Sequence, residues 1–333
     1  MRITFLILAP VLLICCSGGG DLVPPRDYIS EVSFAGSDTA WVITRGHDLW
    51  RVAGDGRTMR IEDFNGAAKV VFFLDEQTGW VLDRSGQLFK ILNGMEWEVV
   101  GTLSDARDIL GASEMAFADE ENGWLITSNG TLKTDNGGKD WRKISRPDIP
   151  NKYLSGPTAL YLKGPSGGWF TFNKETVAFT EDNGLTWHLE ILGSGERDVS
   201  DISCNHDAAK CFIGTAGGGL FSLPYHNSSK PQPVDGDWSE LSIRSLTFAT
   251  DRTIYAAGFR FSLSPQDLPT GVVFRSDDGG ASWKSLDSHP SARRFERIDF
   301  SNERIGWLAS DESLYRTIDG GSSWQELFSQ EVR

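Results

Sequence analysis

Basic side chains gather near the C-terminus of this sequence. Arg293, Arg294 and Arg297 surround Phe295, and Arg244 lies further upstream. Guanidinium groups bind carboxylates through paired hydrogen bonds, and they also stack on aromatic rings. Because the formal net charge of the chain is −14, a basic cluster is unexpected. It predicts a binding site for a carboxylate or for an acidic segment of a partner.

The same cations have a second interpretation, in which they neutralise carboxylates inside the protein. They fall at the starts of strands that the repeats described below place around a common axis. Charges of both signs stand there: Lys69, Arg244, Arg294 and Arg297 are basic, and Glu31, Glu114 and Asp201 are acidic. The sequence leaves partner binding and internal pairing both open.

Signatures of catalysis are missing from the sequence. It has no nucleophile elbow, in which a G-x-S-x-G turn leads from a strand into a helix, no phosphate-cradling loop, and no pair at metal-ligand spacing among its 5 histidines. A sialidase would need three arginines, a Tyr/Glu nucleophile pair and an acid, because glycosidic cleavage passes through a cationic transition state. No tyrosine has a glutamate at a persuasive partner position. The sequence therefore predicts no enzyme, no cofactor and no metal site.

An eight-residue pattern of hydroxyl, carboxylate or carboxamide, glycine and tryptophan recurs at 134–141, 180–187, 276–283 and 317–324. In a tight hairpin turn, an Asp or Asn accepts hydrogen bonds from turn amides, a glycine adopts positive φ, and the Trp begins the next strand. One such side chain per repeat is spread around a ring, so we interpret them as turn braces and not as catalytic or metal-binding groups. The residues are Asn136, Asp182, Asp278 and Asp319, followed by Trp141, Trp187, Trp283 and Trp324.

A second pattern, an aromatic or apolar residue with an aromatic seven positions later, recurs seven times. Successive copies are 39 to 52 residues apart, the period of a propeller blade. The sequence thus predicts an all-β fold, a seven-bladed β-propeller of four-stranded antiparallel blades. The pairs are Phe34/Trp41, Phe73/Trp80, Phe117/Trp124, Leu162/Trp169, Cys204/Cys211, Phe248/Tyr255 and Phe300/Trp307.

The third repeat shows the expected layout of a blade. Its strands are predicted at 113–117, 124–127, 131–134 and 141–144, with a hairpin turn at Asn129-Gly130. The sixth repeat has an insertion at 259–270, a loop suited to partner contact or a tolerated surface insertion. No window shows helical periodicity with caps, and no terminal strand obviously completes a blade at the other end of the chain.

Cys204 and Cys211 take the two landmark positions of the fifth repeat, which should face each other across the inner hairpin. Facing positions in an exported protein favour a disulfide. Two buried thiols are the alternative. A zinc site would need more ligands than nearby His206.

The N-terminus resembles an export signal. Arg2 is followed by the apolar run 3–14, and the run ends at Cys15-Cys16 in a pattern similar to a bacterial lipobox. We predict a lipoprotein signal peptide at 1–16 with lipidation on Cys16, a flexible tether at 17–27, and the propeller at 28–333. Simple secretion and an uncleaved anchor are the alternatives.

The turn pattern resembles the Asp-box, or BNR repeat, of sialidases, sortilin-type receptors and the photosystem II stability/assembly factor family. The photosystem II stability/assembly factor family is the most similar of the three, because it combines seven blades with a sequence motif like that of residues 117–124, followed by Asp-boxes. The resemblance covers roughly residues 28–328. It implies an exported, noncatalytic assembly chaperone with an arginine patch on one face, which Arg244, Arg294 and Arg297 match in part. Sialidases are six-bladed, and their Arg-Ile-Pro stretch is absent here.

We therefore predict a noncatalytic cell-envelope lipoprotein, on the periplasmic or outer-membrane face, that binds a protein partner or assists complex assembly as a monomer. The alternative is a carbohydrate-binding or sialidase-like glycoside hydrolase propeller. An acidic chain offers no basic face for nucleic acid, and membrane contact is expected through the lipid anchor alone.

Overall fold

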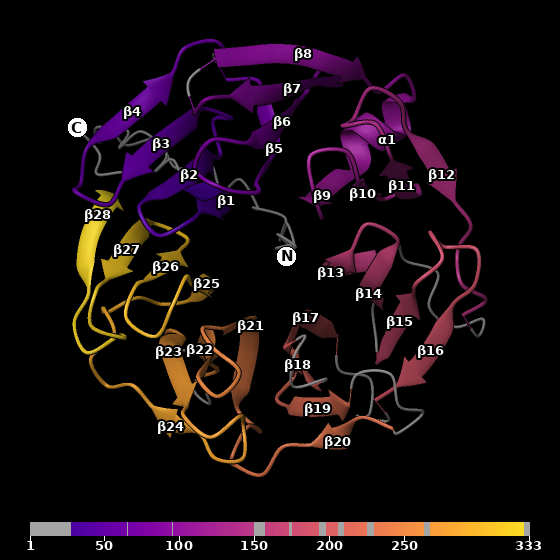
Figure 1. Cartoon of the computed structure of the whole chain (residues 1–333). Coiled ribbons are helices and arrows are strands. Elements are labelled where there is room, and N and C mark those ends of the chain that lie inside the picture. Colours follow the sequence, from indigo (N-terminus) through magenta and orange to yellow (C-terminus); the bar gives the residue numbers. More distant parts are fainter. Residues whose placement is uncertain are drawn as a thin grey trace, which may run out of the picture.

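Seven sheets stand around a central axis in the computed structural model (Figure 1). Each sheet, or blade, contains four consecutive antiparallel strands. The predicted all-β, seven-bladed propeller is therefore confirmed. The structure describes residues 28–64, 66–94, 96–149, 157–172, 175–192, 198–205, 210–224, 230–262 and 267–329. The predicted signal peptide, tether and Cys16 lie outside these residues.

The blades follow one another around the ring in sequence order (Figure 1). Blades 1 to 4 consist of β1 (Ile29–Ala35), β2 (Thr39–Thr44), β3 (Leu49–Ala53), β4 (Thr58–Ile61); β5 (Ala68–Phe73), β6 (Gly79–Asp83), β7 (Gln87–Leu92), β8 (Glu96–Thr102); β9 (Ala112–Phe117), β10 (Gly123–Thr127), β11 (Gly130–Thr134), β12 (Arg142–Ile144); and β13 (Pro157–Gly164), β14 (Gly167–Phe172), β15 (Thr176–Thr180), β16 (His188–Ile191). Blades 5 to 7 consist of β17 (Val199–Asn205), β18 (Lys210–Thr215), β19 (Leu220–Pro224), β20 (Gln232–Pro233); β21 (Leu241–Phe248), β22 (Ile254–Arg260), β23 (Thr270–Ser276), β24 (Lys284–Ser285); and β25 (Phe295–Phe300), β26 (Gly306–Ser310), β27 (Ser313–Thr317), β28 (Gln325–Ser329).

The third blade differs from its predicted layout in two details. Its hairpin turn is Ser128-Asn129, because Gly130 already pairs with Thr127 as the first residue of β11. A short helix that the sequence analysis did not expect, α1 (Ala106–Gly111), precedes β9. The side chain of Asp105 caps this helix by accepting a hydrogen bond from the Arg107 amide, a local signal too short for a periodicity search. In the part of the chain that the structure describes, no helix is of a length and apolarity that would span a bilayer.

Aromatic stacking joins neighbouring blades. Trp80 on β6 lies parallel to Phe117 on β9, with ring centroids 3.7 Å apart, and Trp141 meets the edge of Phe117 at 6.1 Å. The Phe117 ring in turn covers Gly123, where a Cβ atom would lie 2.4 Å from that ring. The repeated phrase of Phe, Gly and Trp is therefore a packing unit between blades, which is why it recurs in the sequence.

Cys204 and Cys211 form a disulfide, but Cys211 does not take the tryptophan position. It pairs directly with Cys204, as Gly123 pairs with Phe117 in blade 3. Phe212 is the residue that contacts an aromatic ring of the next blade, with its plane tilted 40° to that of Phe248 and the ring centroids 6.0 Å apart. Cys204 and Cys211 are one position further apart than the corresponding pair Phe117 and Gly123. A fixed count of seven positions from Cys204 therefore ends one residue before the position that tryptophan takes in other blades.

The recurring turns are braced by side-chain acceptors. In one of them Asp278 accepts hydrogen bonds from the Ser282 amide at 2.9 Å and from the Ser276 hydroxyl at 2.8 Å. The Ser276 hydroxyl accepts the Gly280 amide at 2.8 Å, and Gly280 has a φ of +81°. The same bonds form around Asn136, Asp182 and Asp319. Trp141, Trp187, Trp283 and Trp324 are half-buried beside these turns.

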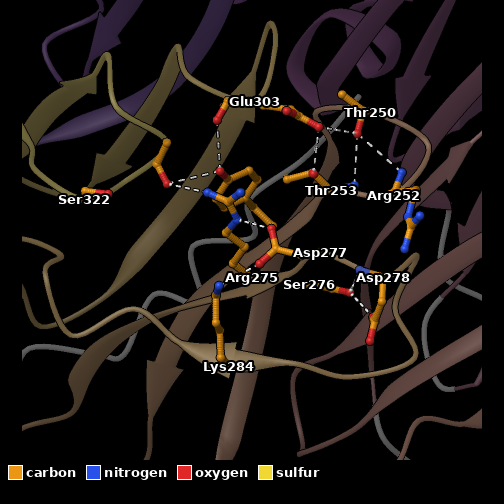
Figure 2. A network of polar contacts seen from close by, with 12 residues as sticks. Thr250, Arg252, Thr253, Arg275, Ser276, Asp277, Asp278, Lys284, Glu303 and Ser322 are labelled. Atoms are coloured by element: carbon orange, nitrogen blue, oxygen red, sulfur yellow. Dashed lines mark hydrogen bonds and ion pairs between the residues drawn. The ribbon is translucent and has the colours of Figure 1, made fainter.

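A cation on the third strand of several blades links to the next blade. Arg275 on β23 lies over the Tyr255 ring, 5.4 Å from its centroid, and donates a 3.1 Å hydrogen bond to the carbonyl of Gly320 in blade 7. Asp277 holds this guanidinium at 2.6 Å (Figure 2). Glu303 of blade 7 accepts from Thr253 of blade 6 at 3.2 Å in the same network. Figure 2 thus shows a polar joint between consecutive blades.

Blade 7 meets blade 1 without exchanging a strand (Figure 1). The Ile29 amide donates to the carbonyl of Asp311 at 2.8 Å. Arg316, the counterpart of Arg275, donates to the carbonyls of Ser37 and Gly54 and pairs with Asp38 at 2.9 Å. We call this contact between blades 1 and 7 the closing joint.

Candidate functional site

A cavity of about 560 Å³ lies where the inner strands begin, at the closing joint. Blades 1, 6 and 7 provide most of its wall. Its charged lining residues are Glu31, Arg45, Arg244, Arg294, Glu296, Arg297 and Asp311, and its apolar ones include Tyr28, Ile29, Val32, Phe259 and Phe261. Four cations and three carboxylates meet in one hollow, so it can hold an anionic group beside an apolar one.

A β-bulge at the start of every inner strand positions part of this lining. Each bulge leaves one residue without a cross-strand partner, which turns its side chain out of the regular alternation. In blades 1, 3 and 4 a hydroxyl fills this position and donates to a carbonyl of the second strand. The bulged residues are Ser30, Lys69, Ser113, Thr158, Ser200, Arg244 and Glu296. Arg244 and Glu296 therefore reach the cavity because of the bulge.

The predicted basic residues separate into different environments. Arg244 pairs with Glu296 at 2.9 Å, and both side chains are mostly buried. Arg297 is buried on the axis, whereas Arg293 and Arg294 are exposed. Arg293 does not line the cavity.

Phe295 is not the aromatic at the centre of the arginines, because it is fully buried in the core between blades 6 and 7. Arg294 instead lies over Phe259, 4.7 Å from the ring centroid. Lys69 stands apart on β5 outside the cavity, where burial lowers its pKa and the nearby Glu31 opposes that effect.

The axial carboxylates are mostly structural. Asp201 accepts the Leu246 amide of the next blade at 2.6 Å, and burial raises the pKa of Glu114, whose oxygens have no hydrogen-bond partner among the described residues. Burial also raises the pKa of Glu31 to about 8, although Arg297 and Lys69 oppose the shift. Arg244 does pair inside the protein, as the second interpretation expects, but its partner is Glu296 of the next blade and not Glu31, Glu114 or Asp201 across the pore.

A second axial cavity, of about 340 Å³, lies toward the other end of the inner strands. It shares Glu31, Val32 and Arg297 with the first, so the two hollows meet at these residues. Within the described ranges, His, Cys, Asp and Glu side chains form no cluster of three that could hold a metal ion.

Several lining residues escaped the sequence analysis. Arg45 follows β2 of blade 1, and Ser242 lies on β21 with a buried hydroxyl that has no hydrogen-bond partner in the described part of the chain. Their position depends on the meeting of the first and last blades. The sequence did point to Phe259 and Phe261, because they lie in the first part of the insertion at 259–270. Residues 263–266 of that insertion lie outside the described residues.

No protein-family model and no curated protein matches the sequence. Solved structures with the same fold include YCF48 from Cyanidioschyzon merolae, at 17% identity and a TM-score of 0.65, over 89% of this chain and 95% of that one. A structure of YCF48 bound to D1 peptide is similar at 18% identity and a TM-score of 0.56, over 78% of this chain and 81% of that one. The GH74 enzyme of Niastella koreensis is similar at 12% identity and a TM-score of 0.66, over 90% of this chain and 54% of the enzyme. Identities this low show a shared propeller fold.

Proposed function

We propose that this chain is a noncatalytic scaffold of the cell envelope that binds a protein partner through the cavity at the closing joint. The observation that carries the proposal is the gathering of Arg45, Arg244, Arg294 and Arg297 in one cavity, where Arg294 lies over Phe259, in a chain of net charge −14. Arginine beside an aromatic ring is typical of sites that carry binding energy. The similar YCF48 structure with a bound peptide supports a protein partner for this fold.

The test is capture of a partner from envelope extracts, followed by reconstitution with that partner in purified form. Arg294→Glu reverses a charge in the cavity and should weaken binding by a factor of ten or more, since removing one partner of a charged contact costs about 2 kcal/mol or more. Arg293→Glu is the matched control, because Arg293 is exposed in the same segment but does not line the cavity. Equal binding by the wild-type protein and the Arg294 variant would exclude this site.

A carbohydrate-active propeller is the second candidate, favoured by the similarity to a GH74 enzyme and by the carboxylates Glu31, Glu296 and Asp311 in the cavity. Glu296 is already paired with Arg244 at 2.9 Å, so its carboxylate is engaged within the protein. Hydrolysis of xyloglucan by the purified chain, abolished by Glu296→Gln or Asp311→Asn, would establish this alternative and overturn the noncatalytic proposal.

The envelope location is proposed from the sequence alone. Residues 1–15 would be removed and Cys16, which would become the first residue, acylated, with 17–27 as the tether between the lipid and the propeller. The mass of the mature N-terminus decides this part of the proposal, since an unmodified Cys16 would contradict it.

A further inference from the structure

The closing joint differs from the other joints of the ring in how it is held. Every other pair of neighbouring blades is consecutive in sequence and is joined by a linker from an outer strand to the next inner strand. Blades 7 and 1 are held by side-chain packing and a few hydrogen bonds, with Phe34 6.2 Å from Trp307 and the Ile29 amide on the Asp311 carbonyl. At this joint β1 packs against β26.

The cavity takes its lining from both sides of this joint. Arg45 comes from blade 1 and Arg294 from blade 7, and neither forms an ion pair within the described residues. Arg244 is already engaged by Glu296, so the exposed arginines are the ones able to accept a new anion. Phe259 and Phe261, the latter 40% exposed, provide an apolar wall beside them.

We propose that a partner segment carrying a carboxylate next to an apolar side chain binds in this cavity, and that its binding and the closure of the ring stabilise each other. The proposal rests on the proposed function and adds a coupling to it. The argument for this ligand is charge complementarity: Arg45 and Arg294, which form no ion pair with any described residue, line the hollow from opposite sides of the joint. A ligand that contacts both blades can do so only when the joint is closed. The free energy of ligand binding therefore adds to the stability of the closed joint.

Coupling of this kind is reciprocal. By linkage, closure of the joint strengthens ligand binding by the same factor by which bound ligand favours closure. A substitution that opens the joint in part of the molecules weakens apparent binding in proportion to the closed fraction that is lost. Arg316 allows this to be tested away from the cavity, because it bonds the carbonyls of Ser37 and Gly54 and does not line the cavity. Lys90 is its matched counterpart at the joint of blades 2 and 3, where it pairs with Glu120 at 2.8 Å and lies over Trp80.

The first experiment measures amide hydrogen exchange with N-acetylphenylalanine as the probe and its uncharged amide as the control ligand. Saturating probe should slow exchange at Gly54, which does not line the cavity and whose amide bonds the Asp38 carbonyl where Arg316 holds the closing joint, and leave Phe73 unchanged. The Phe73 amide bonds Ser33 at the joint of blades 1 and 2 and is the internal control. Exchange at Gly54 that does not respond to bound probe overturns the coupling.

The second experiment measures probe affinity in variants of the full chain. Arg316→Ala should weaken binding about fivefold or more, the usual lower range of allosteric coupling, while Lys90→Ala leaves it unchanged. Asp38→Ala removes one of the Arg316 contacts and replaces that variant if it does not fold.

The outcomes separate this proposal from the proposed function. Probe binding that depends on Arg294 but is insensitive to Arg316→Ala overturns the coupling and leaves the scaffold function standing. Failure of the probe to bind overturns the proposed ligand class. Partner capture that is independent of Arg294 overturns the function itself.

Discussion

Glu31 lies where the two axial hollows meet and is half-buried there. Burial is the main reason that its pKa rises from 4.5 to about 8, and the charges of Arg297 and Lys69 offset burial only in part. The folded state therefore holds a proton on Glu31 at a pH where the unfolded chain has released it. Groups with such shifts, placed in a cavity, are typical of functional sites.

Stability should consequently depend on pH. Below about pH 4.5 the carboxyl is protonated in both states and its contribution is fully present; it is lost as pH rises through about 8. Urea unfolding of the wild-type protein should lose on the order of a few kcal/mol across this window. Glu31→Gln should remove much of that loss, whereas Glu121→Gln, at an exposed position, should not. An identical pH dependence in wild type and Glu31→Gln would contradict the assignment.

At the scale of the element, the recurring turn works because one side chain accepts several donors. Asp182 accepts the Thr186 amide at 2.9 Å and the Thr186 and Thr180 hydroxyls at 2.5 and 2.9 Å. These hydrogen bonds hold its pKa at about 2. Asn136 accepts the corresponding amide at 3.0 Å in blade 3, so the turn needs an acceptor oxygen and not a negative charge.

This predicts a ranking of variants at one position. Asp182→Asn should keep a melting temperature close to that of the wild-type protein, because the carboxamide oxygen still accepts the Thr186 amide. Asp182→Ala leaves that amide to water and should melt at a lower temperature. Thermal unfolding monitored by circular dichroism measures both. Equal losses in the two variants would show that the charge itself stabilises the turn.

In the molecule as a whole, every blade is made of four consecutive strands. The closing joint therefore brings together two complete blades, as every other joint does, but no linker connects them. A connection from Ser329 to Ile29 would resemble the segment 286–294 that joins β24 to β25. The blades should therefore keep their order around the ring when the termini are moved to another joint.

A circular permutant tests this separation. Joining 329 to 29 and opening the chain at exposed Ser104, between β8 and α1, should preserve the strand content and the cooperative unfolding transition. Opening at Ser128, within the hairpin of β10 and β11, divides one blade between the two termini and should lower stability by more. A permutant opened at Ser104 that is less stable than the one opened at Ser128 would contradict the equivalence of the joints.

The sequence by itself determined the number of blades and the bracing turns, because both depend on contacts that recur within a repeat or between neighbours. Examples are the contact of the Phe117 ring with Gly123 and the hydrogen bond from the Ser282 amide to Asp278. Only the tertiary structure shows which arginines share a cavity. It also shows that Phe212, and not Cys211, contacts the next blade. These features depend on a bulge, on turn length and on the meeting of the first and last blades, which bring together side chains far apart in sequence.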